Sequence, residues 1–387
     1  MQIVQRSPER FLPACERVLA RYRPLEPDRA AELIARVLAL TTADCEATLA
    51  QTLERFSWRH RELSQTLLSH FEQISGLLPQ APESLSREQK LLIGAYFTME
   101  YSIEAAAFFN PSLVPAPDQS GCTAEQLRVI FSFRAVGEGH ISSLVFRQAI
   151  LEAGHLHPEP VGSFVESPAS ITLIDPEGYE LRFASQTDLS ERVIFPLLEH
   201  ERNGIEDARF VHFTQADGSQ TYYATYTAYD GRQIQPRLLQ TDDFTSFRSY
   251  SLRGPGAVNK NLALFPRLIQ GRYAMLARID GVNNYIMFSD TLTHWEQPQL
   301  IQTPRESWEF GNIGNCGSPL ETEAGWLVIT HGVGPMREYA LGAILLDRNH
   351  PGRPIARLRE PLMLPQADER EGYVPNVVYA CGSLLHG

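Results

Sequence analysis

The chain has little that would place it in a membrane or in an oxidising compartment. It contains no run of 18 apolar residues, and its first ten residues carry no apolar core of signal-peptide length. Its five cysteines are scattered and form no CxxC pair, so we expect reduced, structural thiols. These absences predict a protein of the cytoplasm that has no membrane partner.

Basic clusters and metal-binding patterns are also missing. The formal net charge is -12, and Lys and Arg are not gathered into the kind of patch that holds a phosphate backbone, which disfavours a nucleic-acid partner. Eleven histidines form no HExxH motif or paired ligand spacing, so we expect no metal and no cofactor. Gly137-Glu138-Gly139 lacks the third glycine of a nucleotide-binding loop and is interpreted as a tight turn.

The sequence does contain enough apolar material for a large core. Its 387 residues are 43% hydrophobic and 21% charged, which is typical of a globular chain with two domains. The character of the sequence changes near residue 110, where helical spacing gives way to short β-type runs. We therefore place a domain boundary there.

Before residue 110, apolar side chains recur at the spacing of amphipathic helices. The pattern predicts helices around residues 11–19, 31–38, 49–56 and 63–74, a linker over residues 76–86, and a fifth helix over residues 86–109. Asp28 and Asp44 stand where helix N-caps are expected. The first domain is thus predicted to be an α-helical N-terminal domain, residues 1–109.

Residues 110–387 consist of short runs rich in Val, Ile, Tyr, Phe and Thr, separated by turn signals such as Asp230-Gly231 and Asp280-Gly281. This spacing predicts a mainly β domain, either a sandwich, a barrel or a propeller. The runs show no fixed repeat, and the three architectures share strand length and turn chemistry, so the pattern leaves all three open.

Two neighbouring stretches carry the strongest chemical signal. Glu206 and Asp207 stand together before a predicted strand, and the next strand is rich in tyrosine and threonine, including Tyr226 and Tyr229. A carboxyl group can donate a proton to a glycosidic oxygen, while aromatic and hydroxyl groups hold a polar, flat-faced sugar ring. The two stretches therefore favour carbohydrate chemistry.

These motifs and others, in their order along the chain, resemble glycoside hydrolase family 130, the beta-mannoside phosphorylases and mannosidases. The matching segments lie at residues 110–111, 139–147, 204–210, 222–231, 260–266, 325–333, 345–347 and 374–378. The resemblance implies a five-bladed β-propeller over residues 110–387 with a central active site. Members of the family usually continue past the segment that matches Cys381-Gly382, so we expect an incomplete C-terminal blade.

The resemblance also implies site residues. Asp207 matches the general acid, which acts through the 3-hydroxyl of bound mannose. Such a relay needs a neutral carboxyl, and burial among tyrosines is expected to raise its pKa. The expected substrate-binding residues are Glu206, Tyr226, Tyr229, Asp230, Asp280 and Asn376.

Inverting cleavage needs a second function on the far side of the sugar ring, and this function decides the reaction. For hydrolysis the candidate is Glu321, a catalytic base that would activate water at a position where many family phosphorylases carry lysine. A carboxylate there would repel phosphate. The other interpretation is that Glu321 is a surface or turn residue and that Arg337 supplies the missing positive charge.

For phosphorolysis, basic side chains must converge on inorganic phosphate, which is then the co-substrate. The candidate phosphate ligands are His140, Arg147, Lys260, Arg278 and His331. Our preferred hypothesis is an inverting β-mannosidase that hydrolyses β-1,2-linked oligosaccharides. The alternatives are a phosphorylase that forms mannose 1-phosphate and a non-catalytic glycan-binding propeller. Assembly into a homo-oligomer is left open.

Overall fold

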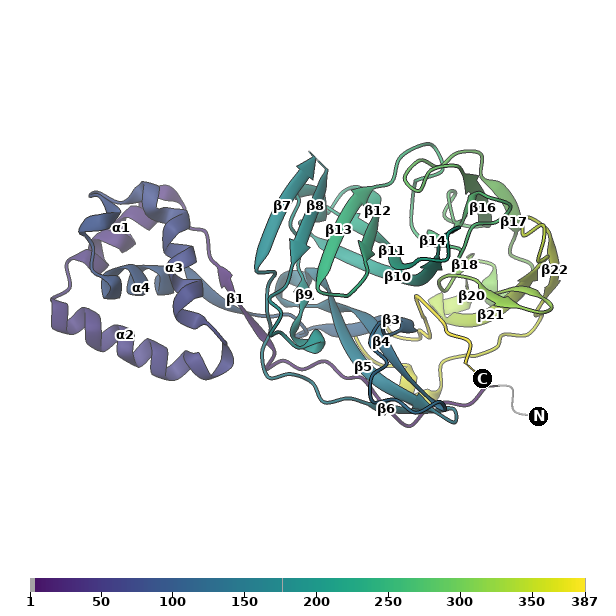
Figure 1. The fold of residues 1–387 in the computed structure, drawn as a ribbon, viewed down its shortest axis with the longest axis horizontal. Helices are drawn as coiled ribbons and strands as arrows, with labels where there is room; N and C mark the ends of the chain where they lie inside the picture. The colour runs from purple at the N-terminus through teal and green to yellow at the C-terminus, as the bar shows by residue number, and fades with distance from the viewer. Residues whose placement is uncertain (1–3, 176, 387) are drawn as a thin grey trace. The chain divides into compact units, whose positions relative to one another are not determined.

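The computed structural model describes residues 4–175 and 177–386, and these residues form two compact units (Figure 1). One unit holds the described residues up to Pro13 together with Ala106–Gly162 and the chain from Ser167 onwards. The other holds Ala14–Ala105 and Ser163–Glu166. The α-helices of the described chain lie in this second, smaller unit, and the fold as a whole is mainly β.

The smaller unit is a helical cluster with a short strand pair. Its elements are β1 (Val18–Tyr22), α1 (Pro27–Leu38), α2 (Thr42–Phe56), α3 (Leu63–Ile74), α4 (Arg87–Tyr96) and β2 (Thr98–Ser102). Ile34, Phe71 and Ile93 meet in its core. Gly94 lets α4 approach α3 closely, because a Cβ at this position would lie 1.9 Å from the carbonyl oxygen of Leu67. None of the helices in the described residues is long and apolar enough to cross a membrane.

Helices α1, α2 and α3 lie where the sequence predicts them. The fifth predicted helix, over residues 86–109, is confirmed only as α4 (Arg87–Tyr96), and the helix predicted around residues 11–19 is wrong. Val18–Tyr22 pairs antiparallel with Thr98–Ser102, so both segments are strands. A short apolar run has no period long enough to separate helix from strand, and here the two runs pair with each other. The N-caps of α1 and α2 are Glu26 and Thr41, and Asp44 instead donates its backbone N–H to the Thr41 side chain.

The larger unit begins with an extensive sheet. Its strands are β3 (Ala107–Pro115), β4 (Gln126–Val136), β5 (Ser142–Glu152), β6 (His155–Pro158), β7 (Ser170–Asp175), β8 (Gly178–Arg182), β9 (Val193–Ile194), β10 (Gly204–Thr214), β11 (Gln220–Tyr229), β12 (Ile234–Thr241) and β13 (Ser246–Ser251). Their order is β3-β4-β5-β10-β11-β12-β13-β8-β7, and β6 and β9 pair with β5. Strands β10 to β13 thus follow one another as an antiparallel meander.

Two further sheets follow along the chain. The first contains β14 (Ala263–Leu264), β15 (Tyr273–Ala277), β16 (Asn284–Ser289) and β17 (Gln299–Gln302), paired in that order. The second contains β18 (Asn312–Asn315), β19 (Leu320–Thr322), β20 (Gly325–Val333), β21 (Tyr339–Leu346) and β22 (Pro354–Arg357). Its path is β18-β20-β21-β22, with β19 on the end of β20. The ladders in both sheets are antiparallel.

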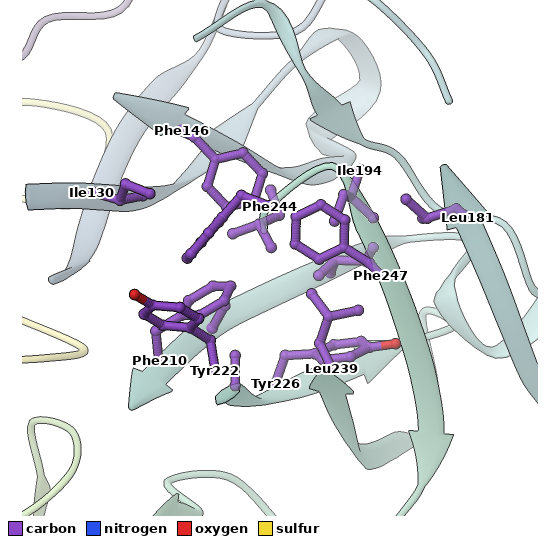
Figure 2. Close-up of a cluster of buried hydrophobic side chains, with 14 of the residues drawn as sticks. Ile130, Phe146, Leu181, Ile194, Phe210, Tyr222, Tyr226, Leu239, Phe244 and Phe247 are labelled. Atoms are coloured by element: carbon purple, nitrogen blue, oxygen red, sulfur yellow. The ribbon is translucent and has the colours of Figure 1, made fainter. Parts of the chain in front are cut away.

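The core of the large sheet is built from phenylalanine rings (Figure 2). Phe146 and Phe247 stack with ring centroids 5.7 Å apart, and Phe210 stacks with Phe244 at 5.6 Å. Because side chains alternate along a strand, β10 sends Phe210 into this cluster and Val211 into a second buried cluster. Strand β10 is therefore packed on both faces, which fixes the position of its N-terminal end.

Candidate active site

The two acids singled out in the sequence lie at a bulge in β10. Glu206 is paired with Thr227 and Arg209 with Thr225, so the register of the ladder shifts between them. Asp207 occupies this bulge with a left-handed backbone, φ 54°. Bulges re-aim side chains out of a ladder, and left-handed backbone at a non-glycine residue costs on the order of 1–3 kcal/mol. Here the bulge brings Asp207 to the wall of a cavity of about 860 Å³, a volume common for ligand sites.

Strand β3 carries a matching bulge. Its register with β4 shifts between Phe109 and Ser112, and Asn110 has φ 57°. The Nδ2 of Asn110 donates a hydrogen bond of 2.6 Å to Oδ1 of Asp207. Two bulges on different strands thus hold the acid and its amide partner against each other.

Positive charge is concentrated around the two carboxylates. Arg134 Nη2 lies 2.6 Å from Glu206 Oε1, and Arg134 Nη1 lies 3.5 Å from Asp207 Oδ1. Lys260 Nζ lies 2.5 Å from the other oxygen of Glu206. Arg209, buried behind the acid, donates hydrogen bonds to Asn315. Glu206 therefore acts as a bridge that holds two cations beside Asp207.

These cations reverse the expected protonation of the acid. Burial raises the pKa of Asp207, but the charges of Arg134, Arg209 and Lys260, together with the hydrogen bond from Asn110, hold that pKa below its ordinary value. The prediction that burial among tyrosines would raise the pKa is therefore wrong for this arrangement, because the neighbouring charges outweigh desolvation. Asp207 is therefore ionised at neutral pH in this arrangement.

A second basic group lines the same cavity. Arg278 Nη1 donates to Asn312 Oδ1 at 3.0 Å and lies 3.4 Å from His331 Nε2. Its Nε is buried and has no hydrogen-bond partner in the part of the chain that the structure describes. Burial, followed by the charges of Arg278 and Arg209, lowers the pKa of His331 well below its ordinary range, so this imidazole is neutral. Arg278 also lines the cavity, which brings its positive charge to the space that a ligand can enter.

The predicted phosphate ligands are only partly brought together. Those that line the cavity are Lys260, Arg278 and His331. His140 is exposed and its Nδ1 lies 3.0 Å from the hydroxyl of Tyr373, which does line the cavity. Arg147 is buried, with its guanidinium 4.8 Å from the centroid of the Phe108 ring. These two residues lie behind or beside the cavity wall.

Glu321 lies in a different environment from Asp207. Arg267 donates to its two oxygens at 2.8 and 2.7 Å, and Arg348 Nη2 donates at 3.2 Å. The hydrogen bond from Arg267 lowers the pKa of Glu321. Among the described residues that line the cavity, the carboxylates are Asp207 and Glu371. The structure therefore does not bring Glu321 together with the acid.

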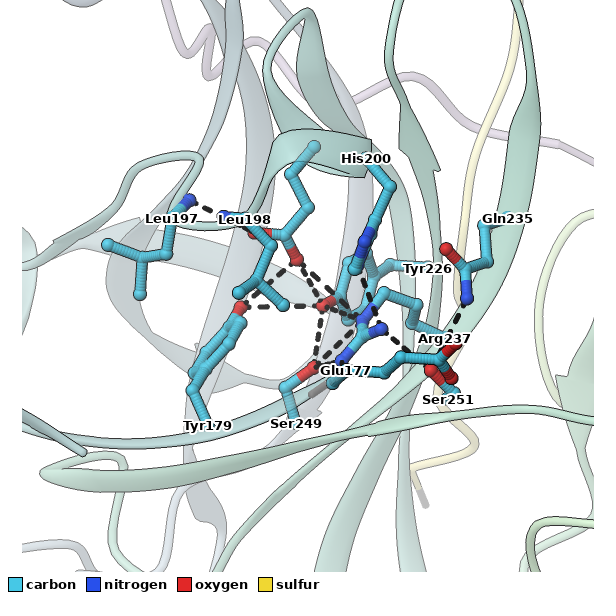
Figure 3. Close-up of polar contacts among 11 residues, drawn as sticks. Glu177, Tyr179, Leu197, Leu198, His200, Tyr226, Gln235, Arg237, Ser249 and Ser251 are labelled. Carbon is cyan, nitrogen blue, oxygen red and sulfur yellow. Dashed lines mark hydrogen bonds and ion pairs between the residues drawn. The ribbon is translucent and has the colours of Figure 1, made fainter. Parts of the chain in front are cut away.

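Tyr226 points into the protein core (Figure 3). Its hydroxyl donates to Glu201 Oε1 at 2.7 Å, lies 2.8 Å from Ser249 Oγ and accepts from Arg237 Nε at 3.0 Å. Burial raises its pKa, followed by the charge of Glu201. Tyr226 therefore belongs to a hydrogen-bonded network inside the sheet, and it does not line the cavity as described.

The other predicted sugar ligands also lie outside the described cavity lining: Tyr229, Asp230, Asp280 and Asn376. Asp230 accepts two backbone N–H groups of its own turn, each at 2.7 Å. Asp280 accepts from the Tyr285 hydroxyl at 2.8 Å; burial raises its pKa, but its hydrogen bonds lower it to about 2. Asn376 accepts from Arg370 Nε at 2.8 Å. The carboxylates of Asp230 and Asp280 thus stabilise the turns that follow β11 and β15.

Sequence reasoning overlooked other residues that line the cavity. Arg134 is a single cation in the mostly apolar run Val129–Val136 of β4, and a charge within a buried strand is a signal that could have found it. Tyr379 accepts hydrogen bonds from Arg209 and Asn261, a contact between distant segments that no local pattern predicts. Arg337, weighed as a substitute charge for Glu321, lines the cavity. The described residues contain no group of three or more His, Cys, Asp or Glu side chains that could hold a metal ion.

Comparison with known protein sequences gives consistent matches. A family model described as beta-1,4-mannooligosaccharide phosphorylase matches residues 177–387. A 1,2-beta-oligomannan phosphorylase from Thermoanaerobacter sp. (strain X514) is 38% identical over 194 residues, which is 48% of this chain and 62% of that protein. A beta-1,2-mannobiose phosphorylase from Listeria innocua serovar 6a is 30% identical over 201 residues, 50% of this chain and 55% of that protein. The chain thus spans somewhat over half the length of these curated relatives.

Solved structures resemble the fold as well. A chain from Parabacteroides distasonis ATCC 8503 superposes with a TM-score of 0.52 at 18% identity, covering 73% of this chain and 82% of that one. A structure described as belonging to glycoside hydrolases that target beta-1,2 mannosidic linkages in Candida mannan gives a TM-score of 0.50 at 17% identity. The latter covers 72% of this chain and 77% of that chain. At such identities these likenesses establish the fold alone.

Proposed function

The chain belongs to glycoside hydrolase family 130, and from that premise we propose that it is an enzyme that cleaves β-mannosides by phosphorolysis and releases mannose 1-phosphate. The proposed substrates are β-1,2-linked manno-oligosaccharides, on which the curated relatives act by name. This proposal reverses the order of our sequence-based hypotheses, which put hydrolysis first.

The observation that carries the proposal is the charge of the cavity. Four of its described lining residues are cationic: Arg134, Lys260, Arg278 and Arg337. Phosphate is held in proteins by charge-assisted hydrogen bonds from such groups. Glu321, the base that hydrolysis was expected to use, is instead engaged by Arg267 and Arg348.

In the proposed reaction a phosphate oxygen attacks the anomeric carbon of mannose on the face opposite the leaving group. The bond from that carbon to the glycosidic oxygen breaks, and the proton of Asp207 reaches the departing oxygen through the mannose 3-hydroxyl, as the family resemblance implies. The products are mannose 1-phosphate and a saccharide one residue shorter. Phosphate adds negative charge beside Arg134 and Lys260, which offsets the field that keeps Asp207 ionised.

One observation supports hydrolysis as a second candidate. Glu371 lines the same cavity and is exposed, so its carboxylate is available to activate water. Inverting hydrolysis needs roughly 6.5–9.5 Å between the acid and such a base, with room for the water between them. Glu371 therefore replaces Glu321 as the residue to test if hydrolysis occurs.

We propose in addition the five-bladed propeller that the family resemblance implies for residues 110–387. The helical domain expected over residues 1–109 corresponds to the smaller unit, which holds Ala14–Ala105 and Ser163–Glu166. Consecutive antiparallel strands such as β14–β17 support this arrangement, since each blade of a propeller is a sheet of this kind. A closed ring would seat the cavity at its centre, where several sheets contribute residues.

Product analysis on β-1,2-mannobiose, with and without inorganic phosphate, tests the proposed function. We expect mannose 1-phosphate and free mannose in equal amounts only when phosphate is present. Asp207→Asn should reduce this activity by roughly 10²- to 10⁴-fold, because an amide cannot supply the proton.

Free mannose alone, formed at the same rate without phosphate, would contradict phosphorolysis and make Glu371→Gln the next variant. If neither product forms from β-1,2- or β-1,4-linked substrates while the saccharides still bind, the chain is a glycan-binding propeller. Circular dichroism of the wild type and Asp207→Asn provides the control for folding.

A further inference from the structure

The cavity has an apolar end that the proposed bond cleavage does not use. The residues that form it, which we call the aromatic wall, are Phe11, Leu12, Phe108, Phe109, Phe133 and Tyr373. All of these except Tyr373 lie before residue 177, outside the segment that the family model matches. The family match therefore does not specify what this wall binds.

The rings of the wall form two groups. Asn110, which donates to Asp207, directly follows Phe109, whose ring stacks on Tyr373 with centroids 6.0 Å apart. Next to Phe109 on the strand, Phe108 stacks on Phe133 at 4.2 Å. Phe11 lies 5.1 Å from Phe133, so Phe11, Phe108 and Phe133 form a second group of rings beside the N-terminal segment. Both groups of rings line the same cavity, one next to Asp207 and the other next to the N-terminal segment.

Residues 6–13, which we call the N-terminal strap, are held by ion pairs and supply part of this end of the cavity lining. Arg6 makes a two-pronged contact with Glu369, at 2.9 and 3.0 Å, and donates to the carbonyl of Leu364 at 2.6 Å. Arg10 pairs with Asp368 at 2.9 Å. These ion pairs hold the strap close to residues 371–374, which supply the facing part of the cavity lining.

The N-terminal strap contributes apolar side chains to the lining of the cavity. Leu12 is 68% exposed although it lines the cavity, and Phe11 is half-buried against Phe131 and Phe133. Exposed apolar groups at the rim of a concave site are typical of a surface that a ligand covers. A pyranose ring offers a matching apolar face of C–H groups, whereas phosphate does not.

We propose that the aromatic wall and the N-terminal strap bind the leaving-group saccharide, and that Phe11 confers preference for substrates longer than a disaccharide. The proposal rests on the proposed function, because it takes the sugar at Asp207 to be the mannose that is released. The leaving-group ring next to the bond then lies by Phe109 and Tyr373, and the following ring reaches Phe11. Phe11 is thus a specificity residue with no part in bond cleavage.

Binding measured without turnover tests this inference. In an Asp207→Asn background, titration calorimetry compares β-1,2-mannobiose with β-1,2-mannotriose, with and without Phe11→Ala. We expect Phe11→Ala to weaken mannotriose binding by roughly 3- to 10-fold, the range for a lost aromatic contact, and to leave mannobiose unchanged. Phe11→Trp should restore mannotriose binding. Arg6→Ala should reproduce part of the loss in mannotriose binding, because it removes the ion pair with Glu369 that holds the strap.

Tyr96→Ala is the matched control, since Tyr96 is a half-exposed aromatic residue at the end of α4 outside the cavity lining. Equal weakening of both saccharides by Phe11→Ala would overturn the inference, because it would show a general structural effect. Unchanged binding of both would overturn it as well. If the Asp207→Asn protein with an intact strap binds neither saccharide, the proposed function itself has failed, and the two failures are thereby distinguished.

Discussion

Two polar clusters in the larger unit are built from the same residue types but differ in their surroundings. In the network of Figure 3, Arg237 and Glu201 are fully buried, and Tyr226 joins them through hydrogen bonds to both. Around Asp207, arginine, glutamate and tyrosine side chains also meet, but there they line a cavity. One cluster faces inward and the other faces a space that a ligand can enter.

The difference lies in how completely the polar atoms are satisfied. The guanidinium of Arg237 donates to Tyr226, Ser249, Ser251 and the carbonyl of Glu177. At the cavity, by contrast, Arg278 Nε and Asn261 Oδ1 are buried without a partner among the described residues. Buried polar groups are nearly always hydrogen-bonded in stable structures, so the cluster at the cavity is less completely satisfied than the network of Figure 3. A closed network of the same composition indicates a structural role.

The largest effect is expected from breaking the closed network. Glu201→Gln leaves the Arg237 charge buried without its counter-ion, and removing one partner of a buried ion pair costs about 3–5 kcal/mol. We expect a loss of this size in the free energy of unfolding, measured in urea, with kcat per folded molecule unchanged. We expect stability to change and kcat to stay the same because this cluster does not line the cavity.

Glu199→Gln is the matched control, since Glu199 lies in the same short helical turn, is 82% exposed at its side chain and pairs only with Arg202 among the contacts described. It should change stability by less than about 1 kcal/mol. A large loss of activity in folded Glu201→Gln would contradict the distinction between the two clusters.

The next effect is expected at the open cluster. Arg278→Met removes a charged donor from the cavity, and hydrogen bonds to charged groups contribute about 1.5–3 kcal/mol. We expect the KM for phosphate to rise by roughly 10- to 100-fold, with a much smaller change in the KM for mannobiose. Initial rates at varied concentrations of each substrate separate the two constants.

Arg272→Met serves as the control, because Arg272 is an exposed arginine just before β15 that pairs with Asp290, just after β16. A rise in the KM for mannobiose alone would place Arg278 on the sugar and remove it from the phosphate site.

The comparison also explains how much the sequence could predict. The candidates Asp207, Lys260 and His331 come from motifs that are short local segments, and all three line the same cavity. Tyr226 was assigned to the sugar because it lies in a tyrosine-rich strand that resembles the family, but such a pattern does not tell which side of the sheet the side chain faces. That side proved to be the core, which depends on the neighbouring strands β12 and β13.

The same reasoning applies to the fold and to the charge of the acid. The helices α1–α3 follow from local spacing, whereas the pairing of Val18–Tyr22 with Thr98–Ser102 joins segments some eighty residues apart along the sequence. The pKa of Asp207 depends on Arg134, Arg209 and Lys260, which come from three separate parts of the chain. Local pattern predicts elements and motifs, and tertiary contacts decide which of them meet.

Phosphate should shift the pH dependence of the reaction in a defined direction. Without a ligand the pKa of Asp207 is depressed, mainly because cations outweigh burial, so the acid loses its proton at low pH. Bound phosphate adds negative charge near those cations, which raises the pKa and keeps the acid protonated to higher pH. The limb at which kcat/KM for mannobiose falls with rising pH should therefore move to higher pH at saturating phosphate. Profiles that coincide at low and saturating phosphate would contradict this coupling.

The smallest effect is expected at Glu321, although the sequence made it a candidate base. Its carboxylate is partly exposed and is shared between Arg267 and Arg348, and ion pairs of this kind contribute about 0–1 kcal/mol. Glu321→Gln should therefore leave kcat and both KM values within about twofold, and the loss in stability should be small. Glu371→Gln, which changes a carboxylate that lines the cavity, is measured beside it for comparison. A hundredfold fall in kcat with Glu321→Gln would show that this side chain reaches the reacting groups, and the division between satisfied and unsatisfied clusters would then fail as a guide to function.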